Sequence, residues 1–307
     1  MIKGILYRLS PPAKFAVSLL IIITCFFLLY FIGLVISMAL FDWNILQNSH
    51  LLSDFSNPKT IQVLKFLQLI QSIGIFLLPP LIIGYLCYPS MSDFLRLKRK
   101  PSLLIFLFTI LAGIFFLPFS NWLAYINSFL DLPASMSWIE QWMRSSEASA
   151  GKLTEAFLNV SDTTGLLYNV LLIAILPSIG EELLFRGLLQ RIFTQWAKNS
   201  HWGIWISAFL FSAIHLQFFG FLPRFFLGVF FGYLLEITGS LWVPILAHFI
   251  NNFTGVLLSF FITNHAISEK ANDFGMTSGT WIYGIIGGLL GCFMLWLIMK
   301  KEKRITN

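Results

Sequence analysis

Charged residues and cysteines are both scarce in this chain. Only 11% of its 307 residues are charged, whereas 57% are hydrophobic, and the mean hydropathy is +0.79. A soluble globular domain carries about a quarter charged residues, so this composition excludes a large water-soluble fold. It predicts instead a protein that crosses a membrane several times.

The cysteines Cys25, Cys87 and Cys292 lie in or beside apolar runs. An odd number of cysteines without a regular spacing excludes a disulfide framework and a thiolate metal site. The sequence also lacks internal repeats, low-complexity segments and any segment with the composition of a soluble domain. We therefore predict one integral membrane domain over residues 1–307.

Several apolar runs approach the roughly 20 residues that a helix needs to cross a bilayer. All of them must be helical, because lipid cannot satisfy exposed backbone groups. The predicted fold is an all-α polytopic membrane bundle of about eight transmembrane helices. The runs cover residues 15–41, 61–87, 102–126, 166–186, 202–218, 221–237, 240–263 and 280–299.

The net charge of +6 comes from short basic tracts between the apolar runs, a distribution that excludes a nucleic-acid-binding surface. Such tracts set membrane topology, because Lys and Arg stay on the cytoplasmic side. With eight spans, four basic segments share one side: residues 3–14, 96–100, 191–198 and 300–304. We expect both termini in the cytoplasm and the protein in the bacterial inner (cytoplasmic) membrane, in contact with membrane lipids.

Polar residues divide the chain into a scaffold and a core. An ionisable side chain at mid-membrane costs about 2.5–3.5 kcal/mol on insertion scales, so such residues are candidates for function. They are nearly absent from the first three spans and concentrate in spans four to seven. We predict a scaffold over 1–130, a non-cytoplasmic loop with interfacial helices over 131–165, a catalytic core over 166–263, and a last span with a basic cytoplasmic tail over 264–307.

The stretch "EELLFR" places two glutamates and an arginine at the end of an apolar run. Glu182 and Arg186 are four residues apart and share a helix face, so they are predicted to pair. Glu181 points about 100° away and has no partner in its own turn, which makes it a candidate base. In the alternative interpretation, span four ends here and all three residues lie among the lipid headgroups.

Two further stretches place a histidine on an apolar helix. "FLFSAIHL" sets His215 four residues after Phe211, and "LAHFINNF" sets Asn252 four residues after His248. A lone buried histidine is more often a hydrogen-bonded structural residue than a catalyst. His248 and Asn252 share a face and are predicted to point at one place in the bundle, whereas Asn251 points elsewhere.

Two other ionisable residues in this half are predicted to lie outside the site. Arg224 follows Pro223 near the end of a span, where a long side chain reaches the interface. Glu236 precedes "ITGS" and is also expected at an interface.

Together the fragments E-E-x-x-x-R, F-x-x-x-H and H-x-x-x-N follow one another over about 165–255. In this order they resemble the CPBP family of intramembrane endopeptidases, also called the Abi or CAAX-protease family. That family includes type II CAAX prenyl endopeptidases and bacteriocin-processing proteases. The resemblance implies hydrolysis of a peptide bond in a membrane-associated or lipid-modified peptide or protein, and it rests on Glu181, Glu182, Arg186, Phe211, His215, His248 and Asn252.

The residue types suit this chemistry. Peptide hydrolysis needs an activated water, a base and donors for the developing oxyanion. Glu181 with His215 would activate the water, and His248 with Asn252 would bind the oxyanion. Glu182 with Arg186 would support Glu181. The resemblance implies the same roles.

Zinc is the main mechanistic alternative, because Glu181, His215 and His248 form a legitimate ligand set. The H-E-x-x-H arrangement of soluble zinc proteases is absent, however, and Asn is a poor zinc ligand but a good oxyanion donor. We therefore favour a site without a metal or other cofactor.

Two other kinds of protein remain open. One is a non-catalytic scaffold or subunit with a partner in a larger membrane complex. The other is a proton-coupled transporter, for which buried Glu and His would also serve. Many transporters show repeated halves, whereas the polar residues here cluster in one half.

The predicted topology leaves one conflict. At 1.5 Å per residue, Glu181 and His248 fall nearer the cytoplasmic face, whereas His215 falls toward the opposite face. The motifs meet only if span five starts later than residue 202 or if the helices are short, bent or tilted. Pro177 and Gly180 are candidates for a break in span four.

Overall fold

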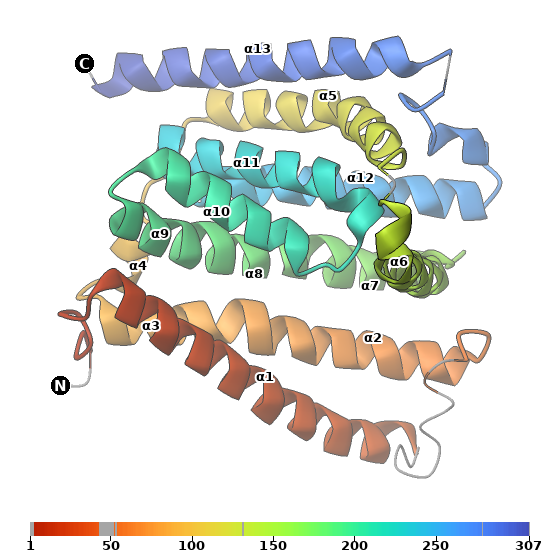
Figure 1. Cartoon of the computed structure of the whole chain (residues 1–307), viewed down its shortest axis with the longest axis horizontal. Coiled ribbons are helices and arrows are strands. Elements are labelled where there is room, and N and C mark those ends of the chain that lie inside the picture. The colour runs from red at the N-terminus through yellow and green to blue at the C-terminus, as the bar shows by residue number, and fades with distance from the viewer. Residues whose placement is uncertain (1–2, 43–51, 53, 131, 278, 307) are drawn as a thin grey trace.

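The computed structural model describes residues 3–42, 52, 54–130, 132–277 and 279–306, which form a bundle of helices with no strand among them (Figure 1). Within this part of the chain, seven helices are long and apolar enough to cross a membrane. They cover Pro11–Phe41, Pro58–Cys87, Leu103–Asn127, Thr163–Ala197, Phe218–Thr238, Trp242–Thr263 and Trp281–Lys303. The prediction of an all-α polytopic bundle is therefore confirmed.

Several of these spans are built from more than one element. The elements are α1 Pro11–Phe41, α2 Pro58–Ser72, the π-helical segment η2 Ile73–Leu77, α3 Leu78–Cys87, α4 Met91–Phe94, α5 Leu103–Asn127, the 3-10 helix η3 Ala134–Met136, α6 Ser137–Leu158, α7 Thr163–Asn169, the π-helical segment η4 Val170–Ile175, α8 Leu176–Glu182, the π-helical segment η5 Leu183–Leu189, α9 Gln190–Ala197, α10 Ser200–Ala213, the 3-10 helix η6 Phe218–Gly220, α11 Phe221–Thr238, α12 Trp242–Thr263, the 3-10 helix η7 Glu269–Ala271 and α13 Trp281–Thr306.

The predicted span 202–218 is shorter than expected. Helix α10 has only 14 residues and packs between α9 and α11. It ends because the His215 ring takes the carbonyl oxygen of Phe211 at 2.7 Å, the acceptor that the next backbone N–H of a continuing helix would use. The following Leu216 has φ +52, a left-handed conformation that turns the chain toward η6. Length and composition therefore support seven spans, and α10 is a further short apolar helix that exposes Trp202, Trp205 and Phe209 on the outer surface.

Span four is longer than expected and unbroken. It continues to Ala197, and Glu182 and Arg186 are buried in the protein interior rather than exposed to lipid headgroups. Pro177 lies in the first turn of α8 and does not interrupt the helix. Gly180 instead allows close packing, because a Cβ there would lie 2.8 Å from the Cβ of Phe76. The π-helical segments η4 and η5 flank α8, and π-helical segments are frequent at functional sites.

The basic segments gather at one end of the bundle. The Leu6 N–H donates to the carbonyl of Leu86 at 2.9 Å, and the Leu241 N–H donates to that of Arg96 at 3.0 Å. Arg99 pairs with Glu302 near the end of α13. Both chain ends therefore lie at the same end of the molecule (Figure 1).

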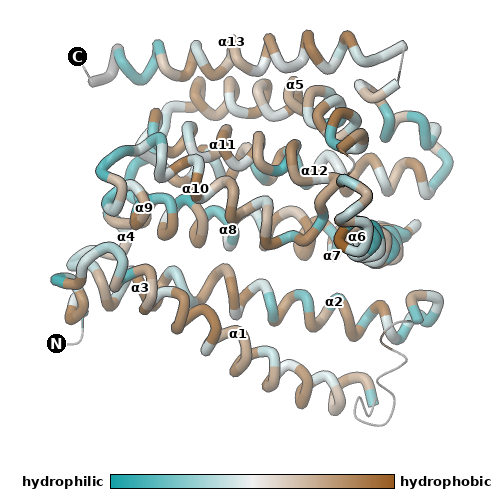
Figure 2. The backbone as a smooth tube through the Cα atoms, viewed as in Figure 1, coloured by the Kyte–Doolittle hydropathy of each residue, from teal (hydrophilic) through white to brown (hydrophobic). Residues whose placement is uncertain are grey.

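The predicted interfacial helix is α6, at the opposite end of the bundle. It carries many hydrophilic residues and lies across the end of the molecule (Figure 2). The Trp142 ring packs 5.1 Å from that of Phe218, and Glu147 accepts a hydrogen bond of 3.2 Å from the Phe219 N–H. These contacts dock α6 on η6.

Helix α1 shows how the outer surface suits lipid. Leu20, Phe27 and Phe31 are each about two-thirds exposed on it. A soluble protein rarely leaves so many large apolar side chains uncovered.

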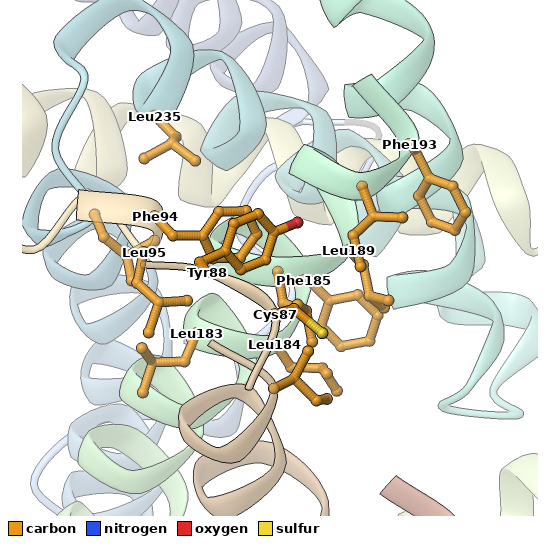
Figure 3. Close-up of a cluster of buried hydrophobic side chains, with 14 of the residues drawn as sticks. Cys87, Tyr88, Phe94, Leu95, Leu183, Leu184, Phe185, Leu189, Phe193 and Leu235 are labelled. Carbon is orange, nitrogen blue, oxygen red and sulfur yellow. The ribbon is translucent and has the colours of Figure 1, made fainter. Parts of the chain in front are cut away.

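Inside the bundle, a buried cluster that includes Cys87, Leu95, Phe185 and Leu235 joins α3, α4, η5 and α11 (Figure 3). The chain is thus an integral membrane protein with a packed interior.

Candidate active site

A cavity of about 330 Å³ lies between α2, α6, the span Thr163–Ala197, α11 and α12. The four predicted catalytic residues, Glu181, His215, His248 and Asn252, all line it. Its other polar lining residues are Gln68, Thr154, Arg224 and Asn251. Its volume is typical of small-molecule and peptide sites.

The extension of span four to Ala197 removes the conflict in depth. Glu181 lies about 24 Å along the helix from the end of α9 at 1.5 Å per residue. His215 follows the 14 residues of α10, which begin beside that end and rise about 21 Å. Both side chains therefore reach a similar depth.

Glu182 and Arg186 form the pair that their spacing predicted. The Arg186 Nη1 donates to the Glu182 Oε1 at 2.7 Å, and both side chains are almost fully buried. Arg186 Nη2 donates to the Gly228 carbonyl at 3.1 Å. The guanidinium lies over the rings of Phe211 and Phe231, at 4.5 and 5.2 Å from their centres. The pair thus ties η5 to α10 and α11.

His248 touches both glutamates. Its Nδ1 lies 2.9 Å from the Glu182 Oε1, and its Nε2 lies 3.9 Å from the Glu181 Oε2. Because a carboxylate oxygen accepts, Nδ1 carries a hydrogen. The ring stacks on Phe231 at 5.1 Å, which fixes its plane. Spacing along the chain gave no sign of the Glu182–His248 contact.

Glu181 is the more available carboxylate. Its side chain is 12% exposed and lines the cavity, whereas that of Glu182 is fully buried. The 3.9 Å to His248 is too long for a direct hydrogen bond. Its oxygens are therefore free to bind a water or substrate in the cavity.

His215 reaches the cavity from the C-terminal end of α10. Its Nδ1 donates to the Phe211 carbonyl at 2.7 Å, since a carbonyl oxygen only accepts. In the neutral ring this leaves Nε2 as an acceptor. Phe211 has a second role, because its ring packs against both His215 and His248.

Asn252 and its neighbour both line the cavity. The Asn252 Nδ2 donates one hydrogen to the Ile173 carbonyl at 3.1 Å, and its Oδ1 accepts from Asn251 at 3.1 Å. The second Nδ2 hydrogen remains for a ligand. The prediction that Asn251 points elsewhere is wrong, because the cavity covers more of α12 than one helical stripe.

Arg224 is the site residue that the sequence interpretation missed. It lines the cavity rather than reaching the interface, and it donates to the Gln217 carbonyl at 3.1 Å and to the Gln217 side-chain oxygen. These bonds hold the segment that follows His215. The available signal was its ionisable side chain inside an apolar span, which alone marks a candidate. Glu236 does lie outside the cavity, 3.6 Å from Arg96.

The polar side chains that the structure describes in the cavity are not arranged as a metal site. Within the described part of the chain, no group of three or more His, Cys, Asp or Glu side chains is arranged to hold one. The Nδ1 atoms of His215 and His248 both donate to oxygen acceptors, which leaves the Nε2 atom of each ring to face a ligand. The residues as placed do not form the zinc set of Glu181, His215 and His248.

Comparison with known proteins agrees with the motifs. The family model described as type II CAAX prenyl endopeptidase Rce1-like matches residues 163–254. The chain is also 31% identical over 86 residues to the uncharacterized protein YpbD of Bacillus subtilis (strain 168), a match that covers 27% of this chain and 41% of that protein. No solved structure matches the chain. The predicted resemblance is therefore confirmed for residues 163–254, which hold all three motifs.

Proposed function

We propose that the protein is an intramembrane endopeptidase that hydrolyses a peptide bond in a membrane-associated or lipid-modified peptide or protein. One observation carries this proposal: Glu181, His215, His248 and Asn252, from three separate spans or helices, line one cavity. The match of residues 163–254 to the endopeptidase family supports it.

The first half of the site would activate water. Glu181 takes a proton from a water molecule whose oxygen attacks the carbonyl carbon of the peptide bond. His215 Nε2 accepts a hydrogen bond from that water and orients it. The C–N bond then breaks as the proton moves from Glu181 to the departing nitrogen, which leaves a new carboxyl and a new amine.

The second half would stabilise the negative oxygen. Asn252 offers its second Nδ2 hydrogen, and His248 offers Nε2–H when that nitrogen is protonated. Because His248 Nδ1 already donates to Glu182, the ring with hydrogens on both nitrogens is an imidazolium. Glu182 also pairs with Arg186, so the charge of the imidazolium would be balanced by the oxyanion that it binds.

Leu153, Thr154 and Phe157 of α6 line the cavity, so it lies toward the end of the bundle that carries α6. We infer a bacterial inner membrane with the basic end and both termini in the cytoplasm, so α6 lies on the other side. Cysteine labelling tests this after Cys292, the exposed native cysteine, is replaced by Ser. Lys98→Cys and Glu147→Cys should react from opposite sides, and reaction from the same side overturns the orientation.

The direct test of hydrolysis uses purified protein in nanodiscs with lipid-modified peptides in water enriched in oxygen-18. Mass spectrometry should find two product peptides, one of which carries a single heavy oxygen at its new carboxyl. A non-catalytic scaffold or a proton-coupled transporter would leave every peptide intact. Intact peptides across a panel of membrane-associated substrates would overturn the proposal.

A further inference from the structure

A second cavity, of about 630 Å³, lies at the basic end of the bundle, away from Glu181. Three parts of the chain form it: the N-terminal segment with the first turn of α1, the turn between α3 and α4, and α9. Lys14, Tyr88 and Arg191 each come from a different one of these parts. The mechanism described above uses none of these residues.

Lys14 is a buried cation at one side of this cavity. The residue is only 6% exposed. Its ammonium group lies over the rings of Tyr7 and Tyr88, at 5.4 and 4.8 Å from their centres. Among the described residues, no carboxylate forms an ion pair with it. Burial of an unpaired charge is unfavourable, so an anion is the missing partner.

Tyr88 supplies an unused hydrogen-bond donor to the same cavity. The residue is 7% exposed, and its buried hydroxyl makes no hydrogen bond of normal geometry within the described part of the chain, although the Gln195 side chain lies near enough to lower its pKa. Its ring stacks on Phe94, which fixes the direction of the hydroxyl (Figure 3). Burial raises the pKa of Tyr88 to about 12, so the hydroxyl keeps its hydrogen. Buried hydroxyls are rarely left unpaired.

Arg191 adds a second positive charge. Its guanidinium lies 4.6 Å from the centre of the Phe94 ring and donates one hydrogen bond to the Asp93 carbonyl at 3.2 Å. The Asp93 carboxylate also lines the cavity, but Lys98 binds it at 2.8 Å. The lining is therefore net positive.

The surroundings place this cavity at the depth of the lipid headgroups. Tyr7 and Trp196 are about half exposed beside it, and Tyr and Trp favour the membrane interface. From Lys14, the exposed side chains of Leu19 and Leu20 continue along α1. An anion held at Lys14 can thus be joined to hydrocarbon chains that run along α1.

We propose that this cavity binds the phosphate group of an anionic phospholipid. Lys14 and Arg191 balance its charge, and the Tyr88 hydroxyl donates a hydrogen bond to a phosphate oxygen. Inorganic phosphate shares this chemistry, but the exposed apolar face of α1 favours the lipid. The site is independent of the proposed peptidase activity.

Native mass spectrometry of the full-length protein in neutral detergent tests this proposal. Phosphatidylglycerol should bind about tenfold more tightly than phosphatidylcholine, because the choline cation of phosphatidylcholine offsets the charge of its phosphate and would be repelled by Lys14 and Arg191. Lys14→Gln with Arg191→Gln should weaken phosphatidylglycerol binding about a hundredfold. The charge-matched control combines Lys3→Gln with Lys100→Gln, at exposed positions near the same end. It should weaken binding less than about tenfold, because exposed charges contribute little.

Tyr88→Phe keeps the charge of the cavity and removes only the hydroxyl. It therefore tests the phospholipid site even if the Lys14→Gln, Arg191→Gln double variant does not fold. It should weaken binding about tenfold. Equal losses in the two double variants, or unchanged binding by Tyr88→Phe, would overturn the site. Binding of inorganic phosphate without a preference between the two lipids would overturn the lipid assignment.

Discussion

His248 and Arg186 share a single oxygen atom, the Oε1 of Glu182, at 2.9 and 2.7 Å. Glu182 therefore links a structural ion pair to a candidate catalytic ring. Glu181 faces the cavity from the next position, so adjacent glutamates have different environments. The same two-residue stretch thus supplies a buried support and an accessible carboxylate.

The Glu182–Arg186 ion pair should contribute strongly to the free energy of unfolding. Glu182→Gln and Arg186→Gln should each lower the free energy of unfolding by about 3–5 kcal/mol, because each leaves a buried charge unpaired. The double variant should lose less than the sum of the two. Reversible unfolding in mixed micelles measures all three values. Strictly additive losses would mean that the two side chains do not interact in the membrane.

Asn252 should matter more than its neighbour Asn251. Asn252→Ala removes an oxyanion donor and should lower kcat about 10²–10³-fold. Asn251→Ala removes only the side chain that donates to Asn252 and should lower kcat less than about tenfold. Steady-state kinetics on one peptide compare the two. If Asn251→Ala is the more damaging, the oxyanion role belongs to Asn251.

Arg224 should act through His215. Its bonds to Gln217 hold the segment after His215, so Arg224→Ala should lower kcat roughly tenfold with little change in KM. Arg224→Lys should recover part of the loss, since a lysine cannot reproduce both bonds. A large rise in KM with kcat unchanged would show instead that Arg224 binds substrate.

Local spacing predicted much of this site, because residues four apart on a helix share a face. That rule placed Glu182 with Arg186 and His248 with Asn252. The same rule could not predict the Glu182–His248 contact, because it joins residues that lie far apart in the chain. It also missed Asn251 and Arg224, because the width of a cavity depends on how α11 and α12 pack.

Apolar runs predicted the fold well, but they did not give the length of α10. That helix ends where His215 binds the Phe211 carbonyl, a local event that hydropathy does not register. Hydropathy also gave no sign of the π-helical segments η4 and η5, because their sequences are as apolar as the rest of the run. The depth at which the motifs meet depends instead on the extension of span four to Ala197.

Hydrolysis should continue without a bound metal. Because Glu181, His215 and His248 are not arranged as a metal site in the described part of the chain, we expect cleavage by purified protein to survive dialysis against a strong chelator. Elemental analysis of the same sample measures zinc per chain. One zinc per chain that leaves with activity, and restores activity when added back, would make Glu181, His215 and His248 ligands instead.

The cleavage rate of Glu181→Gln in nanodiscs tests the central claim most directly. This change keeps the shape of the side chain and removes its ability to take a proton. The account predicts a rate roughly 10²–10⁴-fold below that of the unchanged protein, with normal folding. Asp273→Asn, the matched change at an exposed position, should leave the rate unchanged. A folded Glu181→Gln variant that cleaves at the normal rate would contradict the account.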